Sequence, residues 1–194
     1  MSLDELKANV AAAKQLPKFH FLTGDSSSEN IPEALFEISS QLDRAIQVCK
    51  ELELPVSIIR ACPIVGAHLP VNVAKLRALR IIWSNLLQAH QIEFEALYIK
   101  VLTKINEGIN DETALIENTS ACINAALGNA DMICSFHHAD ANQARLHQNI
   151  QHIMKMESNM HSVDDPLAGS YAIEKMTNQL AHDCWKKLAK QSTS

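Results

Sequence analysis

Five of the six histidines in the second half of the chain are the residues whose type most directly suggests chemistry. They are His137, His138, His147, His152 and His161. Imidazole nitrogens bind transition metals, so this group could form a metal site. However, no His-x-x-x-His pair lies beside a catalytic carboxylate in the pattern of zinc proteases. We therefore expect surface histidines on a long helix, and no metal.

Three cations in one segment, Lys75, Arg77 and Arg80, could contact the phosphate groups of a ligand. Their spacing spreads them around a helix instead of gathering them on one side. Structural ion pairs, or aliphatic stems packed along neighbouring residues, are therefore the favoured interpretation.

Two further polar clusters could be mistaken for sites. Asp164-Asp165 could act as a carboxylate pair, but the following Pro166, Gly169 and Ser170 favour a turn that leads into a helix. The run 26–28 contains three serines and could bind phosphate, but we expect a flexible loop there.

The five cysteines are Cys49, Cys62, Cys122, Cys134 and Cys184. Their number is odd, their spacing is wide and no Cys-x-x-Cys pair occurs, so neither a disulfide framework nor a zinc ribbon is expected. All five lie in apolar stretches. We expect small buried side chains in a reducing compartment.

Composition narrows the class of protein. The chain has 194 residues, 47% of them hydrophobic and 20% charged, with a net charge of −5. Acids and bases are interspersed, so nothing indicates binding to nucleic acid or to a membrane surface. No apolar run could span a bilayer, and no signal peptide opens the chain. We expect one soluble, cytoplasmic domain over 1–194.

Helical patterns alternate with short apolar runs along the chain. Strands are predicted at Phe19–Thr23, from Val56 to about Cys62, at Ala96–Val101 and at Met132–Phe136. Helices are predicted over 3–16, 35–52, from about 71 to 86, 112–127, 140–158 and 173–188. Trp83 and Trp185 are expected to anchor helices on the sheet.

The predicted strands begin near Phe19, Val56, Phe94 and Asp131, at intervals of 37, 38 and 37 residues. Such regular spacing indicates successive strand–crossover–strand units and a parallel sheet. Four strands make either half of an eight-stranded barrel or a small open sheet, and spacing alone does not separate the two. A doubly wound nucleotide-binding sheet lacks support, because no strand is followed by Gly-x-Gly-x-x-Gly.

Two long stretches carry a family resemblance. One is Val163-Asp-Asp-Pro-Leu-Ala-Gly-Ser-Tyr171, continuing through Ile173 to Leu180, and the other is Val73-Ala-Lys-Leu-Arg-Ala-Leu-Arg-Ile-Ile-Trp83. Both resemble the substrate-binding barrel of the methylmalonyl-CoA mutase family. Weaker similarity covers Ala126–Asp131, Arg145, Asn149 and the opening Leu16–Phe19. The resemblance implies an α/β fold, half of a (β/α)8 barrel, with four parallel strands and outer helices.

The resemblance also implies a function. Such enzymes use adenosylcobalamin to interconvert methylmalonyl-CoA and succinyl-CoA by a radical reaction, with the acyl-CoA threaded along the barrel axis. Some members pair a cobalamin-binding catalytic subunit with a related small subunit that is not catalytic.

The residues that the family uses for catalysis are replaced here. Ser26 stands where the family has the His of Gly-Tyr-His, and a hydroxyl does not titrate near neutral pH as an imidazole does. Cys134 stands where the family has another His, and Leu102–Glu107 lacks Gln-Thr-Ser-Gly. The cobalamin motif Asp-x-His-x-x-Gly is missing. The sequence therefore predicts no catalytic residue and no bound cofactor.

The expected role is thus structural: a small-subunit segment, with adenosylcobalamin held by the parent complex. Its partner would be a second copy, giving a homodimer, or a catalytic mutase subunit. Two alternatives stay open: a segment of an active isomerase completed by a partner chain, and a stand-alone module that binds an acyl-CoA at the open strand ends.

Overall fold

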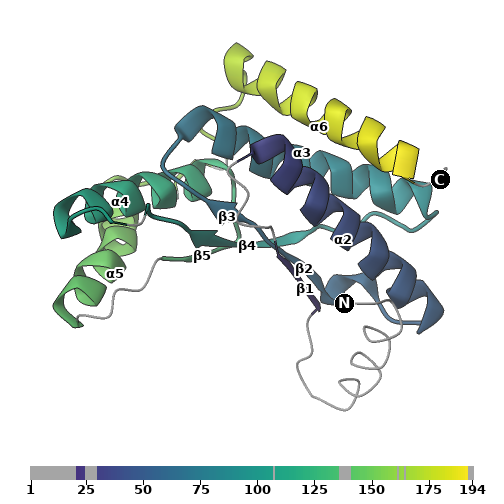
Figure 1. Cartoon of the computed structure of the whole chain (residues 1–194), viewed down its shortest axis with the longest axis horizontal. Helices are drawn as coiled ribbons and strands as arrows, with labels where there is room; N and C mark the ends of the chain where they lie inside the picture. The colour runs from purple at the N-terminus through teal and green to yellow at the C-terminus, as the bar shows by residue number, and fades with distance from the viewer. Residues whose placement is uncertain are drawn as a thin grey trace.

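The computed structural model describes residues 21–24, 30–106, 108–135, 141–160, 162–163 and 165–191, with 21–24 as backbone. Parallel strands form an open sheet in chain order: β1 (Phe21–Gly24), β2 (Ile59–Cys62) with β3 (Ile64–Val65), β4 (Tyr98–Thr103) and β5 (Met132–Cys134) (Figure 1). β1 pairs with β2, β4 pairs with both β2 and β3, and β5 pairs with β4. β1 and β5 are the edges of the described sheet, as predicted.

The second strand position differs from its prediction. Val56–Ile58 form a short 3-10 turn, η1, so the strand begins at Ile59 and not at Val56. Pro63 then divides it into β2 and β3, because proline has no N–H to donate to a ladder. The Pro63 carbonyl still accepts from the Leu102 amide at 3.0 Å. β2 and β3 are therefore one strand position with a break.

Each strand is followed by a helix. These are α2 (Ile31–Glu51), α3 (Leu69–Ala89), α4 (Asp111–Leu127) and α5 (Ala141–Met156), and a last helix, α6 (Tyr171–Gln191), follows α5. All five were predicted, with ends within a few residues. The helix predicted over 3–16 lies outside the described residues.

The helices lie on one side of the sheet. α2 and α3 pack side by side, α6 runs across both as an outer layer, and α4 lies between α3 and α5 (Figure 1). The apolar core fills this space with side chains of α2, α3, β4 and α6. Trp83 is 2% exposed at its centre, as predicted, whereas Trp185 is half-buried at its rim. Parallel strands, outer helices and an open sheet match part of a (β/α)8 barrel, which confirms the predicted fold class.

Four helices end in the same way. After α2, α3, α4 and α5, one residue takes a left-handed backbone conformation: Glu53, Gln91, Asn129 and Asn159, with φ of 54°, 58°, 60° and 49°. In the first three, the next amide returns to a carbonyl five residues back, as in Leu54 to Cys49 at 2.8 Å. These bonds satisfy carbonyls that the helix end leaves without partners.

Candidate functional site

The basic residues of α3 bind backbone carbonyls at the strand ends. Lys75, 3% exposed, donates from Nζ to the Ile64 carbonyl at 2.6 Å. Arg80 donates to the carbonyls of Leu97 at 2.9 Å and Asn129 at 2.6 Å. The structural interpretation of these two cations is confirmed, because both donate to the protein's own backbone.

Arg77 also has a structural role, but it pairs with carboxylates and connects two helices. Its Nη2 lies 3.2 Å from Asp165 Oδ2 and 2.6 Å from Glu174 Oε1, so it joins α3 to α6 and to the turn before α6. Asp131 makes a further structural contact at the start of β4. Its Oδ2 accepts from the Ile99 amide at 2.7 Å and from Arg80 at 3.1 Å.

The turn before α6 confirms the structural interpretation of Asp165. Its Oδ1 accepts from the Leu167 amide at 3.2 Å and its carbonyl accepts from the Ala168 amide at 3.2 Å. Gly169 has φ of +79°, a conformation that favours glycine. Asp165 thus builds the turn and pairs with Arg77. Asp164 lies outside the described residues.

A buried polar network lies beyond the carboxyl end of β4. Thr103 Oγ1 donates to Asn118 Oδ1 at 2.6 Å, and Asn118 Nδ2 lies 2.7 Å from His147 Nδ1. All three residues are buried. An amide nitrogen donates, so His147 Nδ1 accepts and the ring proton lies on Nε2. The network joins β4 to α4 and α4 to α5, where low polarity makes each lost bond costly.

The prediction of surface histidines is therefore wrong for His147, which is 1% exposed, and right for His152, which is exposed. The pattern of α5 alone could not show this, because the partner Asn118 lies 29 residues away. His137, His138 and His161 lie outside the described residues, and no group of metal-binding side chains gathers in the part of the chain that is described.

The cysteines divide into two groups, and none forms a disulfide. Cys49, Cys122 and Cys184 are buried, and burial raises the pKa of each thiol, that of Cys49 to about 11. Cys62 and Cys134 are only half-buried, so the prediction of burial is wrong for these two. Both lie on the side of the sheet without helices.

The strands alternate between the two sides of the sheet. In β4, Ile99, Val101 and Thr103 are buried under helices, whereas Tyr98 and Lys100 are half-buried and Leu102 is 38% exposed. Register places further residues beside these: Arg60 beside Tyr98, Met132 beside Lys100, and Ile64 and Cys134 beside Leu102. No described helix covers this side.

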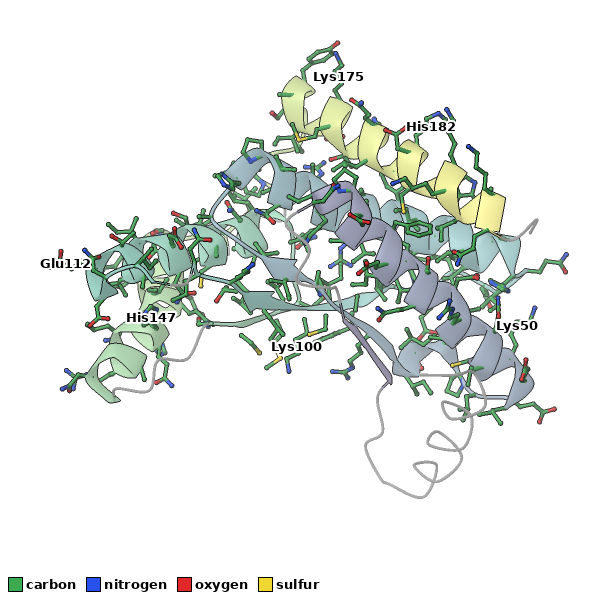
Figure 2. All side chains as sticks on the ribbon, in the orientation of Figure 1. Lys50, Lys100, Glu112, His147, Lys175 and His182 are labelled. Atoms are coloured by element: carbon green, nitrogen blue, oxygen red, sulfur yellow. The ribbon has the colours of Figure 1, made fainter. Side chains whose placement is uncertain are left out.

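We call this side the inner face, because in a closed barrel it would point toward the axis. It consists of Arg60, Cys62, Ile64, Tyr98, Lys100, Leu102, Met132 and Cys134. The Arg60 guanidinium lies 4.3 Å from the centre of the Tyr98 ring, a cation–π contact. Figure 2 shows Lys100 pointing away from α2, α3 and α6. Large side chains therefore line the inner face, and a ligand threaded along the barrel axis would have to pass them.

Comparison with known proteins settles the family. The methylmalonyl-CoA mutase family model matches residues 64–193, about two thirds of the chain. This chain belongs to the methylmalonyl-CoA mutase family. The match begins at β3 and includes both stretches on which the resemblance was based, so the predicted family is confirmed.

Curated members of the family show modest identity. The methylmalonyl-CoA mutase small subunit of Porphyromonas gingivalis is 25% identical over 90% of this chain and 32% of its own length. The small subunit of Streptomyces virginiae is 29% identical over 59% of this chain and 20% of its own length. The methylmalonyl-CoA mutase of Rhizobium meliloti is 29% identical over 62% and 18%. The chain thus spans a third or less of these relatives.

Two of the positions at which the sequence differs from the family's catalytic residues are Ser26 and Cys134. Ser26 and the run 26–28 are outside the described residues, so Ser26 in place of the family His stays a sequence prediction. Cys134 ends β5, half-buried on the inner face. The sequence missed Arg60, Lys100 and Asn118. Alternation along β2 and β4 could have placed the first two, but no local pattern marks Asn118.

None of the described helices is long and apolar enough to cross a bilayer.

Proposed function

We propose that this chain is a structural, non-catalytic member of the methylmalonyl-CoA mutase family, similar to its small subunits, that supports a cobalamin-dependent acyl-CoA isomerase. One observation carries the proposal. The family-like residues Lys75, Arg77, Arg80 and Asp165 are all bonded within the protein, to backbone carbonyls or to opposite charges. The most family-like part of the chain therefore builds the scaffold.

The inner face supports the same proposal. An acyl-CoA that followed the axis of the barrel would meet Arg60 stacked on Tyr98, together with Lys100, Leu102 and Met132. Barrel interiors packed with side chains are cores and not channels. The inner face is therefore better suited to packing against another half-barrel than to the passage of a long, flexible substrate.

The described inner face does not fit adenosylcobalamin. The cofactor's cobalt would need an accessible imidazole, yet no histidine belongs to the inner face as described. His147 is buried against Asn118, and His90 pairs with Asp43 on the helical side at 2.7 Å. We therefore assign the chemistry of the cofactor to groups outside the inner face, and we propose that a partner subunit supplies them. A role beside such a subunit would place this chain in the cytoplasm.

The proposal is tested by cofactor retention and turnover. We expect the purified chain to release adenosylcobalamin on gel filtration and to consume no methylmalonyl-CoA with cofactor added. Ser26→His should stay inactive, because catalytic groups act as a unit and one imidazole restores little. A complete mutase is the positive control. Stoichiometric retention, or turnover by either form, would instead support the alternative of an active isomerase segment.

A further inference from the structure

A hollow lies among the outer helices, where the last turns of α6 lie over α2 and the end of α3 (Figure 1). Its volume is about 500 Å³, which is within the range of sites that hold small ligands. It is on the side of the sheet opposite to the inner face. The side chains that could recognise a ligand there are those of Asp43, Arg44, Gln47, His90, Trp185 and Leu188.

The acceptors of this hollow are already bonded to the protein's own groups. Asp43 Oδ1 lies 2.7 Å from His90 Nε2, and Asp43 Oδ2 accepts from Gln47 Nε2 at 3.1 Å. The side-chain carbonyl of Gln191 accepts from Ser40 Oγ at 3.3 Å. A cationic ligand would therefore have to compete with existing partners for the carboxylate of Asp43.

Two donors of the hollow have no partner in the part of the chain that is described. Arg44 is exposed and makes no hydrogen bond or ion pair there, and a guanidinium carries five N–H donors. The indole N–H of the half-buried Trp185 likewise donates to none of the described residues. Trp83 shows the more usual arrangement, because its Nε1 donates to the Glu95 carbonyl at 2.7 Å. The groups available to a ligand are thus donors.

Apolar surface lies beside these donors. The buried side chains of Leu86 and Leu188 line the hollow together with the Trp185 ring. Trp185 also lines a smaller hollow next to Asn85 and Gln88, so its indole is open to solvent in more than one place. Aromatic rings stack on one another in offset arrangements, and a flat ring would find such a surface here. Available donors beside an apolar surface are the usual composition of a ligand site.

We propose that this hollow binds a small, planar aromatic carboxylate. Arg44 supplies charge-assisted hydrogen bonds to the carboxylate, and Trp185 and Leu188 pack against the ring. A ligand seated there contacts α2, α3 and α6 together, so it strengthens the attachment of the outer helix. The site is separate from the inner face, and the proposal goes beyond the structural role proposed above.

The two tryptophans allow a test with an internal reference. A proton–nitrogen correlation spectrum of the whole chain is recorded during titration with cinnamate, and the indole N–H signal of Trp185 should shift to saturation. The signal of Trp83, which is bonded to Glu95, should stay in place. Trp185→Phe removes one signal and so assigns both. Cinnamylamine has the same ring with the opposite charge, and inorganic phosphate is an anion without a ring. Neither should shift the Trp185 signal.

Arg44→Gln should weaken cinnamate binding at least about tenfold, because it removes a charge-assisted donor. Lys175→Gln is the matched control, since it removes the same charge from the exposed start of α6, away from the hollow (Figure 2). Its affinity should equal that of wild type. Circular dichroism verifies that each variant is folded.

Three results would overturn the proposal. The first is a Trp185 signal that does not respond to cinnamate, and the second is an equal response to cinnamylamine or phosphate. The third is Arg44→Gln binding cinnamate as tightly as Lys175→Gln does. The measurement needs neither cobalamin nor turnover, so this proposal and the proposed function can fail separately.

Discussion

Arg77 on α3 and Glu174 on α6 meet at 2.6 Å, with the guanidinium 18% and the carboxylate 40% exposed. The two residues lie 97 positions apart in sequence. Arg77 also reaches Asp165, so one guanidinium fixes both the entry and the first turn of α6. The attachment of the outer helical layer therefore depends in part on a single side chain.

Arg77→Met should lower the free energy of unfolding by about 1–2 kcal/mol, because two carboxylates lose a partly desolvated partner. Urea unfolding measures the change. Arg44→Met, on the exposed side of α2, is the control and should change stability by less than about 0.5 kcal/mol. An equal loss in both variants would show that Arg77 contributes no specific attachment.

Asn118→Leu should cost about 2–3 kcal/mol, because it removes the hydrogen bonds that Thr103 and His147 make to the Asn118 side chain in a buried place. Urea unfolding again reports the loss, and hydrogen exchange should show α5 opening first. Asn178→Leu, exposed on α6, is the matched control. Unchanged stability in Asn118→Leu would mean that the network adds nothing to the packing of α5.

Gly128→Ala should destabilise the chain by about 1–3 kcal/mol, because the new methyl group would overlap Leu76 Cδ1. The backbone there is not left-handed, so the effect reports packing alone. Gly66→Ala is the control, since no atom lies within 4 Å of its added Cβ. Shortening the neighbour, in Gly128→Ala with Leu76→Val, should cost less than the sum of the two single changes.

Burial of Cys49 predicts a loss of stability at high pH. Its pKa is about 11 in the folded chain and 9.0 in the absence of burial, so the unfolded chain releases the proton first as pH rises. The free energy of unfolding should therefore fall between about pH 9 and pH 11 and should not depend on this thiol below pH 9. The measurement compares urea unfolding at pH 8 and pH 10.5. Cys49→Ala should show a smaller decrease than wild type.

Thiol labelling should distinguish the two groups of cysteines. A water-soluble maleimide should modify Cys62 and Cys134, which are half-buried on the inner face, well before Cys49, Cys122 and Cys184. Mass spectrometry of the digested protein locates each label. A partner seated on the inner face should then slow labelling of the first two only. Early labelling of the buried group would contradict the helical packing described for α2, α4 and α6.

The alternation of helices and strands could be predicted from the sequence because the hydrophobic residues of each unit repeat at a clear period. Leu35, Ile38 and Leu42 repeat at helical spacing and all are buried in α2. The end of the second strand near Cys62 was predicted, but its continuation after Pro63 as β3 was not. The pattern around Val56–Ile58 is as apolar as a strand, and only the 3-10 turn of the folded chain separates it from β2.

The polar residues were harder to predict than the apolar ones. The sequence favoured a structural role for Lys75 but could not show its partner, because its ammonium lies buried against the Ile64 carbonyl, 11 residues earlier. Asn118 and His147 depend in the same way on residues from other units. Hydrophobic periodicity identifies which side of an element is covered, whereas polar partners depend on how separate units meet in space.

The left-handed residues that end α2 and α3 are Glu53 and Gln91, not glycine. A side chain in that conformation costs about 1–2 kcal/mol, and glycine removes this strain at the expense of greater freedom in the unfolded chain. Protein engineers usually avoid glycine as a stabilising residue. In this chain, introducing glycine at these helix ends should raise the melting temperature. The same positions are also places where β/α units from different barrels could be joined without disturbing a helix.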